Sequence, residues 1–371
     1  MSFKRYYPTK DTFIANFDPP SVGSKSISGS NMGASEILNL YKTVENAATA
    51  SILLDFDPIG LPSVVPHQMV LKLFDAQHAE TLPTNYNITL SLIEQAWTEG
   101  AGHDLDYYTD VGYANYNSAT ISTKWLPTTG TAVAATFSLT TGHEDLEIDI
   151  TTLATESFGF KLDIDSTLPT GSDYYIKKFH SRHTHFPTKK PFIEVRAEDY
   201  TGALTTSSFL IGTTGTFSGT VIPPWATVLS ASMSAVLAYV TNSIVDPAGA
   251  LVADLDVRHI YFSDEVVDLH LTVRSKDYNP ATVATASADA PGTVLMDAYY
   301  RIVNERTGEV VVPYGTGTVK YTKLSWNDAG NYFRIYMNSL PTGTLMRFDF
   351  IYNIAGTTSS LPGDDFTFRI I

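Results

Sequence analysis

The chain has 371 residues, of which 24 are basic and 39 are acidic, so its formal net charge at pH 7 is −15. It contains no cysteine, which excludes thiol catalysis, disulfide scaffolds and metal sites built on cysteine. The acidic balance argues against a general nucleic-acid-binding protein, because contacts to phosphates need Lys and Arg. With 43% hydrophobic and 17% charged residues, the composition is that of a folded protein, neither disordered nor membrane-spanning.

Targeting signals are not visible in the sequence. No apolar run suited to a secretory signal follows the early charges of residues 1–17. No segment approaches the roughly 20 apolar residues that are needed to cross a bilayer. We therefore expect a protein without a membrane span that is made and folded in a cytoplasm, with about two to three domains for its length.

Apolar and polar residues alternate at period two in much of the chain, which is typical of half-buried antiparallel strands. Residues 34–45 fit either a helix capped by Ser35 or a strand, and we favour the strand. Clusters of Pro, Gly, Asn, Asp and Thr separate the short runs, so the pattern predicts an all-β protein built from sandwiches or jelly rolls. In chain order, the clearest alternating runs are 51–57, 146–150, 267–273 and 366–370.

Residues 299–303 and 309–312 predict a β-hairpin. The two runs are rich in Tyr, Ile and Val, and Glu305-Arg-Thr-Gly308 lies between them. A short connection that contains glycine between two such runs is typical of a hairpin loop.

The distribution of charge gives the clearest domain boundary. Between residues 201 and 253 the only charged or histidine side chain is Asp246. This composition fits a small β domain with a Ser/Thr surface, or strands that lie across a neighbouring domain. It also fits a surface covered by another protein, because interface cores are depleted of charge, and Trp225 is then the candidate anchor. We therefore expect three regions: 1–199, 200–255 and 256–371.

Motifs for catalysis are lacking. The sequence has no Gly-x-Ser-x-Gly elbow, and its isolated glycine pairs lack the lysine and the strand-to-helix context that bind phosphate. A capsule depolymerase would need two carboxylates in a cleft, but 39 acidic residues offer too many pairs to single one out. We expect no enzymatic activity, no catalytic residue and no cofactor.

The densest polar cluster spans residues 177–196 and contains three histidines. In an extended segment His183 and His185 point to the same side and share a metal ion, whereas His180 points to the other side. The alternative interpretations are a polar loop that faces solvent and a surface that binds an anionic partner. His183 and His185 are the candidate metal ligands here.

A second candidate site is the acidic, glycine-rich stretch 99–110. Alternating oxygen ligands in such a loop suit Ca²⁺, and Asp104 and Asp106 are the candidates. The spacing lacks the 12-residue pattern of an EF-hand and its terminal Glu, so a solvated loop is the alternative. Any metal here would be structural.

Aromatic side chains near the acidic stretch are candidates for binding. Trp97, Tyr107 and Tyr108 lie in or beside it. Exposed aromatic rings on a sandwich stack on sugar rings, whereas buried ones serve packing. We therefore expect either a platform for glycans or core residues at these positions.

Seven short motifs in the first half of the chain follow a particular order. In this order they resemble the DNRLRE-type, TGF-β-propeptide-like jelly-roll modules of bacterial surface proteins and tailed-phage structural proteins. The first two, with Ala298-Tyr-Tyr-Arg-Ile302, look like virion structural proteins of large tailed phages. The motifs are Tyr6-Tyr-Pro-Thr-Lys-Asp-Thr-Phe-Ile14, Gly29-Ser-Asn-Met-Gly-Ala-Ser35, Leu53-Leu-Asp-Phe-Asp57, Leu71-Lys-Leu-Phe-Asp-Ala76, Ala96-Trp-Thr-Glu-Gly100, Lys178-Phe-His-Ser-Arg-His-Thr-His185 and Pro191-Phe-Ile-Glu-Val195.

This resemblance implies a jelly-roll or β-sandwich domain over 1–199, followed by one or two Ig-like β-sandwich domains. It implies a building block of the neck, tail, baseplate or capsid surface of a virion, assembled in the cytoplasm of a bacterial host. Other virion proteins and further copies of the chain would be its partners, because virion parts follow the symmetry of the particle. The alternative function is a carbohydrate-binding or adhesion module that contacts host-surface glycans.

Overall fold

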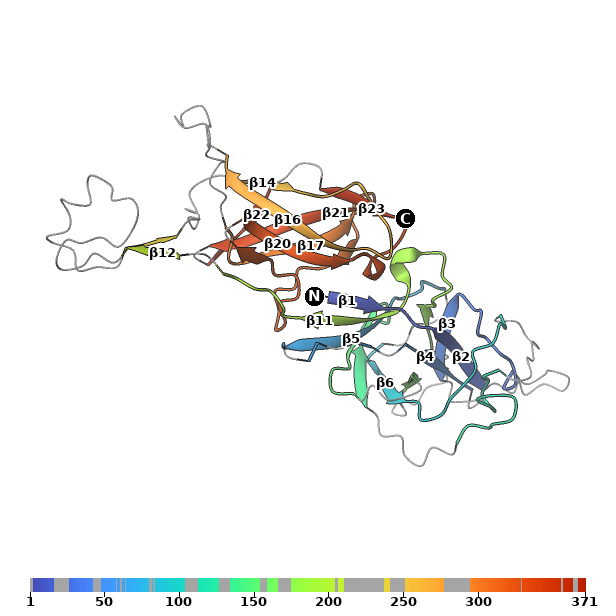
Figure 1. Cartoon of the computed structure of the whole chain (residues 1–371). Helices are drawn as coiled ribbons and strands as arrows, with labels where there is room; N and C mark the ends of the chain where they lie inside the picture. Colours follow the sequence, from blue (N-terminus) through green and yellow to red (C-terminus); the bar gives the residue numbers. More distant parts are fainter. Residues whose placement is uncertain are drawn as a thin grey trace, which may run out of the picture. The chain divides into compact units, whose positions relative to one another are not determined.

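The chain forms two compact units, shown in Figure 1. The N-terminal unit comprises Phe3–Ala197 and Asn338–Thr344, and the C-terminal unit comprises Glu198–Met337 and Leu345–Ile371. This computed structural model describes residues 3–371 except 17–26, 43–47, 58, 61, 64, 80–81, 83, 104–112, 127–133, 154–158, 166–174, 204–205, 210–236, 241–250, 277–293, 328, 355 and 363–365.

Two antiparallel sheets build the N-terminal unit. One has the strand order β1-β11-β5-β8, and the other has the order β10-β3-β4-β9-β6-β7, with β2 paired to β4. A short 3₁₀ helix, η1 (Pro187–Lys189), precedes β11. The strands are β1 (Phe3–Tyr6), β2 (Lys10–Asn16), β3 (Ile37–Lys42), β4 (Thr49–Asp55), β5 (His67–Leu73), β6 (Tyr86–Leu92), β7 (Ala135–Leu139), β8 (Leu146–Asp149), β9 (Phe160–Ile164), β10 (Tyr175–His180) and β11 (Phe192–Ala197).

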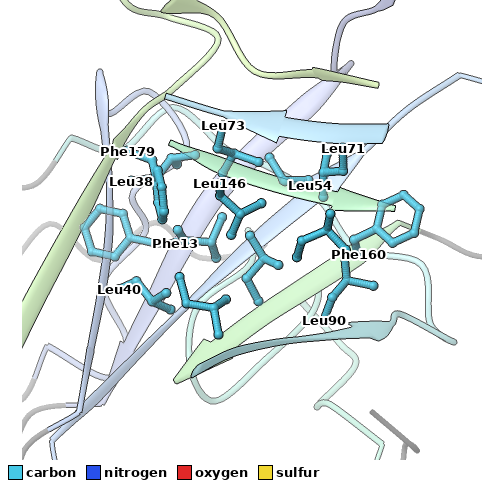
Figure 2. Packing of buried hydrophobic residues seen from close by; sticks show 14 of the residues in the cluster. Phe13, Leu38, Leu40, Leu54, Leu71, Leu73, Leu90, Leu146, Phe160 and Phe179 are labelled. Carbon is cyan, nitrogen blue, oxygen red and sulfur yellow. The ribbon is translucent and has the colours of Figure 1, made fainter. Parts of the chain in front are cut away.

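Apolar side chains from both sheets form one core, as Figure 2 shows. Leu71 and Leu146 come from the four-stranded sheet, and Leu54, Leu90 and Phe160 come from the seven-stranded sheet. Because successive side chains of a strand point to opposite faces, the alternating pattern of each strand places its apolar set in this core. The two sheets therefore form a sandwich.

Strand β2 is buried on both of its faces. Phe13 belongs to the core between the sheets, whereas its neighbour Ile14 belongs to a second apolar cluster with Leu53 and Trp97. That cluster also contains Ile93, Ala114 and Ala119, which lie between β6 and β7 along the chain. This connection covers the outer face of β2, so the residues from Asp11 to Ala15 are buried on both faces, whereas Lys10 and Asn16 at the ends of the strand are partly exposed.

The C-terminal unit also has two main sheets. One has the order β14-β16-β20-β19, and the other has the order β15-β23-β21-β17-β18, with β22 paired to β21. β12 and β13 form a separate antiparallel pair. The 3₁₀ helix η3 (Met337–Ser339) begins at Met337 of this unit, and its other two residues are assigned to the N-terminal unit. The strands are β12 (Thr206–Phe209), β13 (Leu237–Val240), β14 (Leu251–Leu255), β15 (Ile260–Tyr261), β16 (Val266–Ser275), β17 (Ala298–Asn304), β18 (Val310–Val312), β19 (Ser325–Asn327), β20 (Gly330–Tyr336), β21 (Leu345–Ile354), β22 (Thr357–Leu361) and β23 (Thr367–Ile370).

Aromatic rings join the two sheets of the C-terminal unit. Phe333 of β20 stacks on Tyr300 of β17 with their ring centroids 4.6 Å apart. Phe333 also meets Phe348 of β21 edge-on, at 5.4 Å. Ring pairs in these geometries contribute about 0.5–1.5 kcal/mol each beyond the area that they bury. This unit is therefore a second sandwich, with an aromatic core.

The all-β prediction is confirmed. Residues 37–42 form a strand, and β17 and β18 form the expected antiparallel hairpin. The finer assignments, a jelly roll and Ig-like domains, stay predictions, as do the boundaries at 199 and 255. Within the charge-poor segment the structure describes only 201–203, 206–209, 237–240 and 251–253, and β14 at its end pairs with β16.

Candidate functional site

Asp11 is a carboxylate buried in β2. Its side chain is 0% exposed. Oδ2 accepts a hydrogen bond of 2.6 Å from the backbone N–H of Arg182, whereas Oδ1 has no hydrogen-bond partner. The guanidinium Nε of Arg182 lies 3.5 Å from Oδ1. Burial raises the pKa of Asp11 to about 7, and the negative charge of Glu99 raises it further. The hydrogen bond from the backbone of Arg182 lowers the pKa, but by less than burial raises it.

Glu99 lies beside Asp11 and binds the same arginine. Its Oε1 accepts hydrogen bonds from the backbone N–H of Asp11 at 2.7 Å and from Nε of Arg182 at 3.0 Å. Its Oε2 pairs with Nη2 of Arg182, so the arginine holds this carboxylate through two nitrogens. Three donors therefore occupy most of the acceptor positions of Glu99.

His183 completes the cluster. Its backbone N–H donates to Ser181 Oγ at 3.0 Å, and its ring is half-buried with no hydrogen-bond partner for Nε2. Burial and the charge of Arg182 lower the pKa of this imidazole. One ligand atom each from Asp11, Glu99 and His183 lie within 4.8 Å of one another, the only such group of three in the described part of the chain.

Asn31 fixes the loops that carry this cluster. Its side chain is 0% exposed, and its Nδ2 donates to the carbonyl oxygens of Glu99 at 2.7 Å and Ala114 at 2.8 Å. Its Oδ1 accepts from the backbone N–H groups of Gly33 at 3.2 Å and Gly102 at 2.8 Å. One amide thus makes four hydrogen bonds to three separate stretches of backbone.

Glycine is required at two positions around Asn31, because the backbone of a neighbouring segment lies too close to leave room for a Cβ. A Cβ on Gly33 would lie 2.4 Å from the carbonyl oxygen of Glu99, and one on Gly102 would lie 1.9 Å from the carbonyl oxygen of Asn31. Gly100 has φ of +85°, a conformation that side chains rarely adopt. The motifs Ser30-Asn-Met-Gly33 and Trp97-Thr-Glu-Gly100 are therefore two sides of one packed junction.

The structure gives His183 and His185 different neighbours, so their sharing of a metal ion stays a prediction without support from these contacts. Nε2 of His185 lies 2.8 Å from Oε1 of Glu36, and its side chain is 84% exposed, whereas His183 lies with Asp11. The prediction assumed an extended segment, but Arg182 and His183 form a turn, which ends the period-two alternation. Nδ1 of His180 and Oγ1 of Thr184 share a hydrogen bond of 3.1 Å.

The interpretation of 177–196 as a polar loop that enters a strand fits residues 181–191, whereas the two ends of the segment lie in β10 and β11. Lys177 is 0% exposed, pairs with Asp75, and donates to the carbonyl oxygens of Gly142 at 2.8 Å and Glu144 at 2.9 Å. Such a buried ammonium is tolerated because all three of its N–H donors have acceptors. Lys177 therefore has a structural role in β10, where it joins the strand to Asp75 and to the backbone at Gly142 and Glu144.

The aromatic and acidic candidates have different outcomes. Trp97 is 3% exposed and packs on Ile14 and Leu53, so its ring is a core residue and is not available to stack on a sugar. The burial follows from the way its loop covers the outer face of β2 and β4. Outside the described residues lie the other candidates, Asp104, Asp106, Tyr107, Tyr108 and Trp225.

Sequence reasoning missed Asp11 and Asn31. Both lie in motifs that the resemblance singled out, but nothing in the local spacing shows that they are buried. The available signal was an acidic residue inside Lys10-Asp-Thr-Phe-Ile14, a run that is otherwise suited to a buried strand. Charged residues in such positions are almost always paired, and the partner of Asp11 is 171 residues away.

The C-terminal unit has a separate polar cavity of about 580 Å³. Arg347 in its wall binds Glu305 at 2.7 Å and Asp349 at 2.8 Å, and the guanidinium of Arg301 lies 5.1 Å from the centre of the Tyr314 ring. The cavity is therefore lined by two arginines, two carboxylates and four aromatic residues, Tyr314, Phe348, Phe350 and Phe366.

Within the described residues, no helix combines the length and the apolar character that crossing a bilayer requires. The sequence matches no protein-family model, and no curated protein is found as a relative.

Proposed function

We propose that the chain is a structural component of a tailed-phage virion, in its neck, tail, baseplate or capsid surface. It acts by protein–protein assembly, without catalysis. The all-β architecture of two sandwiches supports this proposal, as does the order of motifs in the first half of the sequence.

The observation that carries the proposal is an apolar row on the outer face of the six-stranded sheet. Ile260 of β15 and Leu345 of β21 both pair with Arg369 of β23, so these three side chains lie side by side on one face. Ile260 is 48% exposed and Leu345 is 42% exposed, and Phe262, two residues beyond Ile260, is 58% exposed. Exposed apolar side chains on either side of an arginine are typical of protein contact surfaces.

Incorporation of variants into particles tests this proposal. Phe262→Asp places a charge in the apolar row, and we expect the variant to fold but to be depleted from particles made in the host. Ile121→Asp is the matched control, since Ile121 is 71% exposed in the N-terminal unit, and we expect normal incorporation. Equal incorporation of both variants would show that this face of the sheet is not part of the assembly contact.

A carbohydrate-binding role is the second candidate, and the cavity of the C-terminal unit favours it. Its volume lies in the range of small-ligand sites, and an aromatic ring beside arginine and carboxylates suits hydroxyl-rich ligands. A glycan array probed with the full-length chain, with Arg347→Ala and Tyr314→Ala as variants, tests this role. Binding that both variants lose supports it, and the absence of binding to any bacterial glycan contradicts it.

A further inference from the structure

We infer that Asp11, Glu99 and His183 form a binding site for a divalent transition-metal ion such as Zn²⁺. The inference goes beyond the proposed function and does not depend on it. It begins from two acceptor atoms, Asp11 Oδ1 and His183 Nε2, which are buried and have no hydrogen-bond partner. Buried acceptors of this kind are rare, and an ion that was not considered is one of the accepted explanations.

The burial of Asp11 makes this cluster different from an ordinary acidic surface patch. Its side chain is fully buried, whereas that of Glu99 is 14% exposed. A carboxylate without water needs a donor or a cation at each oxygen. The guanidinium of Arg182 approaches Oδ1 only to 3.5 Å, which leaves this oxygen without a short contact.

The donor set selects the class of metal. One imidazole and two carboxylates suit Zn²⁺, Mn²⁺, Fe²⁺, Co²⁺ and Ni²⁺. Ca²⁺ and Mg²⁺ are bound by oxygen ligands alone, so His183 disfavours them. With metal–ligand bonds of about 2.0–2.1 Å, tetrahedral ligand atoms lie about 3.3 Å apart. Ligand atoms within 4.8 Å reach that spacing by small side-chain rotations.

The surroundings of the three ligands orient them. Arg182 holds Asp11 through its backbone N–H and Glu99 through its guanidinium. Nε2 of His183 has no hydrogen-bond partner, so this nitrogen is the one that would bind the metal ion. The backbone N–H of His183 donates to Ser181 Oγ, which fixes the turn that carries the ring.

The charges of the site also fit a dication. Two carboxylates face one guanidinium, so one negative charge is left uncompensated when both are ionised. A bound dication would connect β2, the loop at Glu99 and the turn at His183, which are far apart in the sequence. Because the unfolded chain does not hold these groups together, metal binding would stabilise the folded N-terminal unit.

The test uses the untagged full-length chain, stripped with EDTA and titrated at pH 8 with Zn²⁺, and with Co²⁺ for its absorption spectrum. We expect one Zn²⁺ per chain, a higher melting temperature that EDTA reverses, and no response to Ca²⁺. His183→Ala should weaken Zn²⁺ binding at least ~10-fold and abolish the Co²⁺ spectrum. His185→Ala is the matched control and should bind as the unchanged chain does, because His185 is exposed and pairs with Glu36.

Three results would overturn the inference: no Zn²⁺ bound at one per chain, binding that survives His183→Ala, or binding that His185→Ala removes. Asp11→Asn probes the buried ligand, and a circular dichroism spectrum first shows whether that variant folds. If it does not fold, the comparison of the two histidine variants decides the question by itself. If Ca²⁺ binds and Zn²⁺ does not, the assigned class of metal is wrong.

Discussion

The side chain of Asn31 donates a hydrogen bond of 2.7 Å to the carbonyl oxygen of Glu99, across 68 residues of sequence. The same amide also bonds Ala114, Gly33 and Gly102. It therefore sets the path of the loop that carries Glu99, and through Glu99 the position of Arg182. The cluster at Asp11 depends on this one buried amide.

Replacing Asn31 by alanine should lower the stability of the N-terminal unit strongly. The substitution leaves two backbone carbonyls and two N–H groups without their partner, and we expect a loss of about 3 kcal/mol in the free energy of unfolding. Urea unfolding followed by tryptophan fluorescence measures it. Asn117→Ala is the control, because Asn117 Nδ2 makes one 3.1 Å bond to Ser28, and a similar loss in both variants would contradict the role given to Asn31.

The glycines of the junction should not tolerate a methyl group. Gly33→Ala and Gly102→Ala would each place a Cβ against backbone oxygen, at 2.4 Å and 1.9 Å. We expect each to cost at least about 2 kcal/mol, because backbone on both sides must move. Gly317→Ala should change stability by less than about 0.5 kcal/mol, since a Cβ there meets nothing within 4 Å. Thermal unfolding of the three variants in parallel makes the comparison.

Trp97→Ala should destabilise the fold. Removing a buried indole from a packed cluster costs about 3–5 kcal/mol. The expected result is a lower midpoint of urea denaturation, with any glycan binding of the folded fraction unchanged. A variant that keeps its full stability but loses binding to a glycan would show that the ring is accessible after all.

Acid should weaken the N-terminal unit through Glu194. Burial alone would raise the pKa of Glu194, but the charges and hydrogen bonds of Arg5 and Arg196 hold it below its ordinary value. Because the folded pKa is lower than the unfolded one, the stabilisation is present above the unfolded pKa and is lost as the pH falls through the folded pKa.

Glu194→Gln tests this sign. The variant should be less stable at pH 7 by about 3–5 kcal/mol, because Arg5 is 5% exposed and loses the negative charge that it pairs with. It should also lose less stability than the unchanged chain between pH 5 and pH 2. If the two proteins lost stability equally as the pH falls, a lowered pKa of Glu194 in the folded state would be contradicted.

The sequence was sufficient to predict the β class, because period-two alternation depends only on neighbouring residues. It also located the hairpin at β17 and β18 from a four-residue turn. It failed at the site because burial there is a long-range property. Asp11 is paired with Leu54 and shares the side of β2 that carries Phe13, which meets the core between the sheets, and its partner Arg182 is 171 residues away.

His183 also shows that sequence spacing does not identify the neighbours of a candidate ligand. Its residue type marked it as a candidate ligand, but the choice of its partner rested on strand parity. The turn at Arg182 and His183 breaks that parity and leaves His185 with Glu36. The residues that meet His183 are set by packing at Asn31, which no local spacing records.

The central claim, that the chain is built into a virion, is tested most directly by counting its copies in purified particles. On this proposal the chain is encoded by a tailed phage, whose particles are separated on a density gradient, and the peptides of the chain are quantified against the major head protein. We predict a fixed ratio across the particle band. A chain that stays in the soluble fraction, with none in the particle band, would contradict the claim.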